Sequence, residues 1–396
     1  MRVCHTLHQL SSFPVYSCAF LSSDELVLGG GGGQSRTGVK NKLRLYKAIA
    51  HKSLEQLDEL ELDKGEDLPM SMAAWPETKR VVCGINSSEE ALKITSNQNC
   101  RRYALEDNKL AFETSANTLA VNTEDDDYQK VTVLSPDGSL VAVAGKHDLA
   151  LLQFPSLEPV ADPVHLEKGE IYDAAFSPTH LVLVTTVNLL VYALPAPSPA
   201  STSEKAAGKQ RASALELVQQ VDRPNLPGKD AGSSFRAARF HPQNPNILYT
   251  VINTVPPRTR TKNSPRRAFI CKWDTNKWKV TNKRQVSDKG LTCFDVSANG
   301  KFVAYGTGDH TLGILDTQTL APLSTILKAH ELPPTVVRFN ITSDLLVSGS
   351  ADNTIRLVSV PDNLTAASWS SWIIVVVTLL VIIFAVIAQQ MHLAAY

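Results

Sequence analysis

The chain has 396 residues, which is too long for one small domain but fits a single large barrel or propeller. Its 39 Lys and Arg residues balance 39 Asp and Glu residues, so the net charge provides no general attraction to nucleic acid. The six cysteines have neither the close pairing of a zinc site nor the density of a disulfide-rich secreted domain, and we expect buried, reduced thiols in the cytosol.

One repeated unit of alternating strands accounts for most of the chain. Each copy contains an apolar strand, a turn, a second apolar strand that ends in small residues, and a third alternating strand. Clear copies occupy residues 131–154, 171–194, 291–315 and 335–360, and weaker copies begin near Val15, Ser71 and Phe235. The pattern predicts an all-β, seven-bladed WD40-type β-propeller over residues 1–362. Two-residue alternation with Pro and Gly at the turns disfavours the competing architecture, a helical repeat.

Two further features fit the predicted ring. Residues 2–7 precede the first unit and alternate weakly, so we expect them to pair with the last blade and close the ring. Asp309 and Asp352 each lie in a turn between two strands, where we expect them to make structural hydrogen bonds.

The connection between the second and third strands of the first unit is unusual. Residues 29–41 read GGGGGQSRTGVKN, and the run of five glycines loses much backbone entropy when it becomes ordered. A simple hairpin needs only two residues, and this loop exceeds the matching hairpin after Gly349 by about seven residues. An extra loop on a rigid strand pair is typical of a binding surface. A tolerated insertion without a function is the alternative.

Three other segments lack the pattern of packed strands. Residues 195–232 begin with a Pro, Ala and Ser-rich stretch and are predicted to be disordered or a long loop insertion at the fourth blade. The acidic residues within 122–128 lack EF-hand spacing and predict a solvated hairpin tip. The basic residues within 256–267 could contact anionic lipid or an acidic partner. A solvated tip with no partner is the alternative.

The C-terminal segment predicts a membrane anchor. Residues 363–396 contain no Asp, Glu, Lys or Arg, and about twenty residues within 369–388 are almost wholly apolar, enough for a helix to cross ~30 Å of hydrocarbon. We expect a linker and transmembrane helix over 363–388 and a short lumenal tail over 389–396, with a buried core helix as the alternative. The N-terminus has no signal-peptide pattern, which favours a cytosolic propeller on a single-pass anchor. The short apolar stretch suits the endoplasmic reticulum.

The sequence contains no recognisable motif for covalent catalysis. Residues 33–40 approach a phosphate-binding loop, but Val39 stands where that motif requires Lys. The histidines are scattered, and we expect neither an enzyme with covalent chemistry of its own nor an organic cofactor.

A propeller whose first blade carries GGGGG…TGVKN, followed by a C-terminal anchor, resembles the prolactin-regulatory-element-binding protein family. Members are endoplasmic-reticulum exchange factors that load GTP onto the Sar-type GTPase and start COPII coats. The resemblance covers nearly the whole chain in layout, and only residues 29–41 are specific in sequence. It implies that this loop is the catalytic element, wraps a potassium ion and pushes against the switch regions of the GTPase.

The resemblance also assigns individual residues. The implied catalytic residues are Gly29, Gly30, Gly31, Gly32, Gly33, Thr37, Gly38 and Asn41. Asn41 would anchor the loop or bind the potassium ion together with backbone carbonyls of the loop. The implied partners are a Sar-type small GTPase and the endoplasmic reticulum membrane, with no nucleic acid. The short tail departs from family members that have a large lumenal domain, and it lacks a retrieval signal.

Two other functions are compatible with this layout. The first is a membrane-anchored propeller scaffold for protein–protein interaction without exchange activity. The second is a DNA-binding regulator, which the neutral overall charge and the predicted anchor disfavour.

Overall fold

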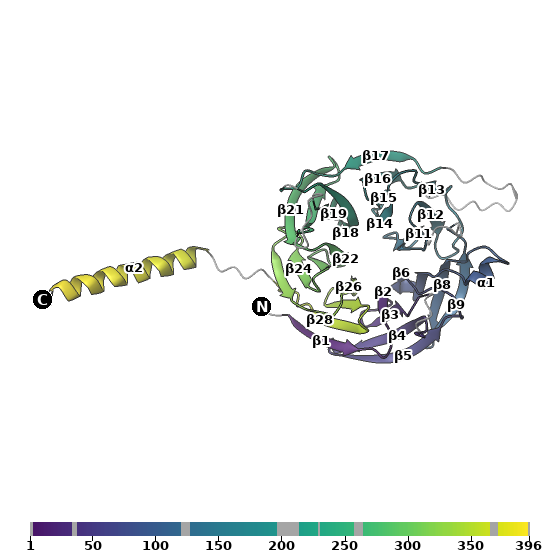
Figure 1. Ribbon diagram of the computed structural model, residues 1–396, viewed down its shortest axis with the longest axis horizontal. Coiled ribbons are helices and arrows are strands. Elements are labelled where there is room, and N and C mark those ends of the chain that lie inside the picture. Colours follow the sequence, from purple (N-terminus) through teal and green to yellow (C-terminus); the bar gives the residue numbers. More distant parts are fainter. Residues whose placement is uncertain are drawn as a thin grey trace.

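Seven four-stranded antiparallel sheets surround a central axis in the computed structural model (Figure 1). The structure describes residues 3–33, 38–119, 127–195, 214–228, 230–256, 264–364 and 371–394. The arrangement confirms the all-β seven-bladed propeller. The blades begin at or next to the residues that the repeat pattern indicates, including the three weak copies.

The first three blades contain twelve strands and two short helices. Blade 1 contains β2 (Val15–Phe20), β3 (Glu25–Gly30), β4 (Lys42–Ile49) and β5 (Ser53–Glu61). Blade 2 contains β6 (Ser71–Trp75), η1 (Pro76–Thr78), β7 (Arg80–Gly84), α1 (Glu89–Leu92), β8 (Cys100–Glu106) and β9 (Lys109–Ala116). Blade 3 contains β10 (Val131–Leu134), β11 (Leu140–Ala144), β12 (Asp148–Gln153) and β13 (Val164–His165).

The remaining four blades complete the ring. Blade 4 contains β14 (Ile171–Phe176), β15 (His180–Thr185), β16 (Asn188–Ala193) and β17 (Leu217–Asp222), and blade 5 contains β18 (Gly232–His241), β19 (Asn244–Val255), β20 (Ala268–Asp274) and β21 (Lys279–Ser287). Blade 6 contains β22 (Leu291–Val296), β23 (Phe302–Thr307), β24 (Leu312–Asp316) and β25 (Pro322–Ile326). Blade 7 contains β26 (Pro334–Phe339), β27 (Leu345–Ser350), β28 (Thr354–Ser359) and β1 (Cys4–Gln9).

The N-terminal strand closes the ring, as the sequence predicts. β1 pairs antiparallel with β28 from Cys4↔Ser359 to Gln9↔Thr354, so the outer strand of blade 7 comes from the opposite end of the chain. This pairing covers a strand edge that would otherwise be exposed.

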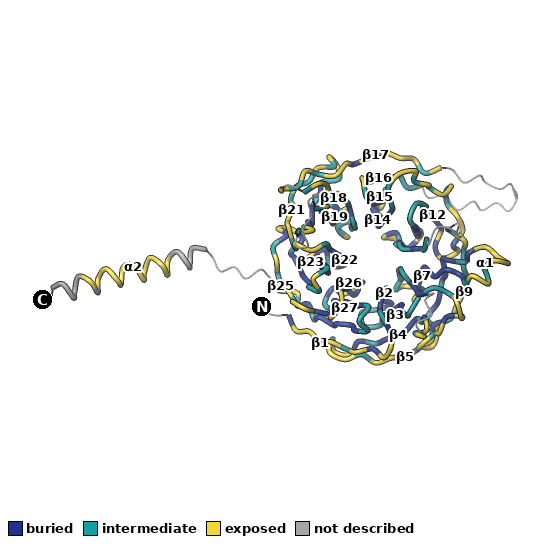
Figure 2. The backbone as a smooth tube through the Cα atoms, viewed as in Figure 1, coloured by how far each residue is buried: buried dark blue, intermediate teal, exposed yellow. Residues whose placement is uncertain are grey.

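Burial decreases from the middle of each blade to its outer strand. Every residue of β23 and of β27 is buried, because the neighbouring blades cover both faces of these strands. The outermost strands β5, β9, β17 and β21 face solvent over much of their length (Figure 2).

The prediction of an insertion over residues 195–232 is wrong for part of that range. Residues 217–222 form β17, which pairs with β16 as the outer strand of blade 4. Only Val221 of this strand is buried, so its sequence lacks the apolar alternation that identifies the inner strands. Residues 196–213 and 229 lie outside the described residues.

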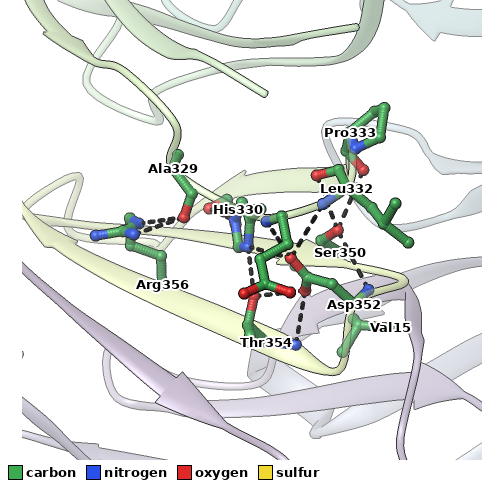
Figure 3. A network of polar contacts seen from close by, with 12 residues as sticks. Val15, Ala329, His330, Leu332, Pro333, Ser350, Asp352, Thr354 and Arg356 are labelled. Carbon is green, nitrogen blue, oxygen red and sulfur yellow. Dashed lines mark hydrogen bonds and ion pairs between the residues drawn. The ribbon is translucent and has the colours of Figure 1, made fainter. Parts of the chain in front are cut away.

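The predicted structural role of Asp352 is confirmed in blade 7 (Figure 3). Its carboxylate accepts hydrogen bonds from the backbone N–H of Thr354 at 2.9 Å and of Glu331 at 2.6 Å. His330, only 4% exposed, is hydrogen-bonded through Nδ1 to Thr354 Oγ1 at 2.6 Å and through Nε2 to Ser348 Oγ at 2.8 Å. The network ties the segment before β26 to the β27–β28 turn. In blade 6, the Asp309 carboxylate accepts from the Thr307 hydroxyl.

The C-terminal helix α2 (Ser371–Ala394) lies outside the ring (Figure 1). Its side chains over residues 376–387 are exposed. No helix in the described part of the chain meets the length and apolarity needed to cross a membrane. The membrane anchor therefore stays a prediction.

Buried His330 should make folding sensitive to acid. Burial lowers its pKa from 6.5 to about 4, so between these values the unfolded chain binds a proton that the folded chain does not. Stability contributed by neutral His330 is present above pH 6.5 and is lost as the pH falls toward 4, by ~3 kcal/mol in total. Urea denaturation followed by tryptophan fluorescence should show a weaker pH dependence in His330→Asn. An equal pH dependence in both chains would contradict this role.

Candidate functional site

The glycine-rich loop connects β3 to β4 at one end of the ring. The ladder ends at Gly30↔Lys42, so residues 31–41 form the connection, whereas blade 7 turns from Ser350 to Thr354. Because neighbouring strands are antiparallel, the connections after the second and fourth strands of every blade emerge at the same end. We call this end of the propeller the loop face.

The first three glycines are required by close packing. A Cβ on Gly29 would lie 2.3 Å from Ser17 Oγ, and one on Gly30 would lie 2.1 Å from the carbonyl oxygen of Pro14. At Gly31 the backbone has φ +145°, and a Cβ would lie 2.2 Å from Asn41 Oδ1. These three glycines are therefore a fixed part of blade 1.

Asn41 joins the two limbs of the loop. Its Oδ1 accepts a hydrogen bond from Gly33 N–H at 2.9 Å, and its Nδ2 donates to the carbonyl oxygens of Gly33 at 3.2 Å and Glu66 at 2.8 Å. The backbone carbonyl of Asn41 accepts from Leu62 N–H at 2.9 Å. The Asn41 side chain thus ties the root of the loop to the β5–β6 connection of the next blade.

The far limb of the loop is more open. Gly38 is exposed with φ +77°, and a Cβ added there would meet no atom within 4 Å. Lys40 forms an exposed ion pair with Glu61 at 2.5 Å. Thr37 lies outside the described residues. Of the predicted site residues, the structure brings Gly31, Gly33 and Asn41 together, while Gly38 lies away from their contacts.

The ion pair between Glu66 and Arg101 supports the root of the loop, and no sequence pattern indicates it. Glu66 receives the Asn41 amide through its backbone and pairs with Arg101 through its carboxylate at 2.6 Å, with both side chains nearly buried. Arg101 also donates to the carbonyl oxygen of Gln98, in the connection that contains α1. These residues belong to ordinary polar stretches, and only the blade 1 to blade 2 packing reveals their role.

The oxygen atoms around Gly33 fit a monovalent cation in kind. Asn41 Oδ1 accepts from Gly33 N–H, the carbonyls of Gly33 and Glu66 accept from Asn41 Nδ2, and a Cβ on Gly33 would lie 3.7 Å from Asp67 Oδ1. Burial raises the pKa of Asp67. Backbone carbonyls and amide oxygens are ligands that potassium accepts in proteins. Within the described residues, no group of three or more His, Cys, Asp or Glu side chains gathers as a metal site.

The cysteines do not supply a nucleophile for this site. Burial raises the pKa of Cys18, Cys100, Cys271 and Cys293 to about 12, so these thiols stay protonated at neutral pH. All six cysteines are free, and Cys4 is exposed. The buried thiols are therefore not available as nucleophiles.

Comparison with known proteins agrees with this architecture. Residues 321–359 match the family model described as WD domain, G-beta repeat. The guanine nucleotide-exchange factor SEC12 of Candida glabrata is 24% identical over 405 residues, which cover 98% of this chain and 80% of that relative. The chain is therefore similar to a SEC12 protein over nearly its whole length. SEC12-like protein 2 of Arabidopsis thaliana is 23% identical over 83% of this chain and 74% of its own length.

The chain is also similar to part of a longer protein. A protein of Candida glabrata named SED4 is 24% identical over 91% of this chain, but the match covers only 32% of that relative's length. The chain therefore spans about a third of SED4.

Two glycine substitutions should distinguish the effect of close packing on folding stability from the effect of backbone preference. Gly31→Ala places a Cβ against Asn41 at a φ that favours glycine, so it should destabilise folding by ~2 kcal/mol more than Gly38→Ala. Gly38→Ala adds a methyl group in open space and changes only the backbone preference. Urea denaturation of both variants measures the difference, and equal midpoints would show that the root of the loop is not held as described.

Proposed function

We propose that this chain is a guanine nucleotide-exchange factor for a small GTPase of the Sar type, acting through the loop of residues 31–41. The supporting observation is the loop itself, which extends the loop face at one blade and is fixed at its root by Asn41. Relatives that align with most of this chain carry the name guanine nucleotide-exchange factor. The site residues proposed for exchange are those that the family resemblance assigns, from Gly29 to Asn41.

The mechanism follows from differential binding. An exchange factor that binds the nucleotide-free GTPase more tightly than the loaded one lowers the affinity for GDP by the same factor. Ordering a loop residue costs about 1–2 kcal/mol, which reduces the free energy available for docking. Because Gly29, Gly30 and Gly31 are already packed and Asn41 already holds Gly33, these residues add little to this cost.

A potassium ion is part of the proposal. The oxygen atoms of Gly33, Asn41 and Glu66 would hold it, and its charge would fix the limbs of the loop before the GTPase binds. Asn41 already accepts from Gly33 N–H through Oδ1, which leaves the second lone pair of that oxygen for the ion.

The setting of the proposed activity is the cytosolic surface of the endoplasmic reticulum. The charge-free C-terminal segment supports a single-pass anchor through α2, with residues 389–396 in the lumen. Loading GTP onto a Sar-type GTPase there would initiate COPII vesicle formation. A membrane-anchored scaffold would use the same propeller without accelerating exchange.

Substitution of Asn41 should abolish exchange without unfolding the ring. Asn41→Ala removes the three side-chain hydrogen bonds that fix the loop root, so the full chain on liposomes should stimulate GDP release from a Sar-type GTPase at least about tenfold less than the unmodified chain. Release of a fluorescent GDP analogue at substoichiometric amounts of the chain measures the rate.

Asn253→Ala is the matched control. Asn253 also donates to and accepts from one backbone residue of the neighbouring blade, Leu291, at 3.1 and 3.0 Å, but it lies in blade 5. Exchange should remain near the unmodified rate in this variant. Stoichiometric binding of the GTPase without accelerated release, by the unmodified chain, would instead establish the scaffold function.

Potassium should stabilise the folded chain through the same loop. Replacement of potassium chloride by choline chloride should lower the melting temperature by about 2 °C, because the folded loop loses a bound ion. Asn41→Ala should melt at the same temperature in both salts. A melting temperature of the unmodified chain that does not depend on the cation would exclude a potassium site in this loop.

A further inference from the structure

The inner strands of five blades share one irregularity. In β2, β14, β18, β22 and β26 the pairing with the second strand skips a single residue near the loop face. The skipped residues are Tyr16, Tyr172, Arg236, Thr292 and Thr335. All five line a central cavity of about 540 Å³. Each bulge therefore directs one side chain of its blade into the channel.

Hydroxyl groups at or beside this position link neighbouring blades over half of the ring. Thr292 donates to the carbonyl of Pro334 at 2.6 Å, and Thr335 donates to the carbonyl of Val15 at 2.6 Å. In blade 1, Ser17 donates to the carbonyl of Pro69 at 2.5 Å. In blade 2, Ser71 donates to the carbonyl of Gln129 at 2.7 Å. The repeated position has a structural role in these blades.

Blades 4 and 5 depart from that pattern. Their bulge residues are Tyr172 and Arg236, and the Arg236 guanidinium lies 4.3 Å from the centre of the Tyr172 ring. Lys130, which directly precedes β10, places its Nζ 5.3 Å from the same ring. Instead of joining blades by a hydroxyl, the chain gathers two cations around one aromatic ring at the channel mouth.

Positive charge exceeds negative charge along the cavity wall. The charged lining residues are Lys130, Arg236, Arg239, Arg338, Glu170 and Asp173. Deeper in the channel, Arg239 is already paired with Asp173 at 2.6 Å, and Arg338 is paired with Asp295 at 3.7 Å. These pairings leave the unbalanced charge near the mouth.

The carboxylates near the mouth do not neutralise Arg236. Glu170 lies 3.9 Å from both Lys130 and Lys146, so two lysines share one carboxylate. Within the described part of the chain, no carboxylate forms an ion pair with Arg236. Burial lowers the pKa of Lys130, and the nearby charges of Arg236 and Lys146 act in the same direction, against the attraction of Glu170 and Asp127. A bound anion would relieve this repulsion.

We propose that the channel mouth formed by Lys130, Tyr172 and Arg236 binds a carboxylate side chain of an extended acidic segment from a protein partner. The guanidinium of Arg236 can hold a carboxylate through two parallel hydrogen bonds, and Tyr172 supports the plane of the guanidinium from one side. The cavity accepts side chains rather than a folded domain, and it opens on the loop face, where Lys130 enters β10. This site is separate from the glycine-rich loop and does not depend on exchange activity.

The test uses a fluorescein-labelled peptide of alternating Asp and Glu residues and the full chain in low salt. Fluorescence anisotropy should show saturable binding, and a matched peptide of Asn and Gln should not bind. Arg236→Gln and Lys130→Gln should each weaken binding of the acidic peptide about tenfold or more, because each removes a cation that faces the carboxylate. Arg236→Lys keeps the charge but loses the two-pronged geometry, so its affinity should be intermediate.

Lys283→Gln is the matched control, because it removes one positive charge from β21 on the outside of blade 5. It should leave the affinity unchanged. Equal binding by Arg236→Gln and the unmodified chain, or equal binding of both peptides, would overturn the proposal. Binding that occurs only after Glu124→Gln, Asp125→Asn and Asp126→Asn would also overturn it, since the chain's own acidic run would then be the occupant.

Discussion

The pairing of β1 with β28 is the constraint on which the rest of the molecule depends. It joins residues near the two ends of the propeller through six matched positions, from Cys4↔Ser359 to Gln9↔Thr354. Without it, blade 7 would have an exposed edge at β28, and blades 7 and 1 would be joined only by side-chain packing and by side-chain hydrogen bonds such as that of Thr335 with the carbonyl of Val15. A ring closed in this way can carry loops of very different length on one face, because the strands beneath them are fixed by both neighbouring blades.

The glycine-rich loop shows how such a ring can support a long connection at low cost. Five consecutive glycines suggest flexibility, yet Gly29, Gly30 and Gly31 are glycines because no Cβ fits beside Ser17, Pro14 and Asn41. The Asn41 side chain then bonds to both the N–H and the carbonyl of Gly33 on the opposite limb, and to the carbonyl of Glu66 in the connection to the next blade. The loop is therefore fixed at its root from Gly29 to Gly33, whereas exposed Gly38 makes none of these contacts. Such a division suits an element that must meet another protein in a defined place.

The sequence predicts the inner strands well, since a nearly continuous apolar run is required wherever both faces of a strand are covered. It predicts the position of the loop for the same reason, because β3 and β4 are strongly patterned on either side. It does not predict β17, whose side chains face solvent and carry no such pattern. The Glu66–Arg101 ion pair behind the loop is also beyond sequence reasoning. Its two residues are far apart in the chain and are brought together only by the packing of blade 1 against blade 2.

The hydrogen bonds that join neighbouring blades differ between two parts of the ring. From blade 6 through blades 7, 1 and 2 to blade 3, hydroxyl groups of the inner strands bond to carbonyls of the following blade. The junction between blades 4 and 5 contains the ion pair of Asp173 with Arg239, and blades 6 and 7 contain a similar pair of Asp295 with Arg338 at 3.7 Å. At the junction between blades 4 and 5, the bulge positions hold Tyr172 and Arg236. The glycine-rich loop stands on the hydroxyl-linked half, and the unbalanced cations stand on the other. A charge pair buried in the channel is stable there because its ions keep hydrogen-bond partners, as Asp173 does with Ala238 N–H at 3.1 Å. Beside this pair, the bulge positions of blades 4 and 5 carry Tyr172 and Arg236, so a position that is structural in other blades faces the channel as a candidate binding surface.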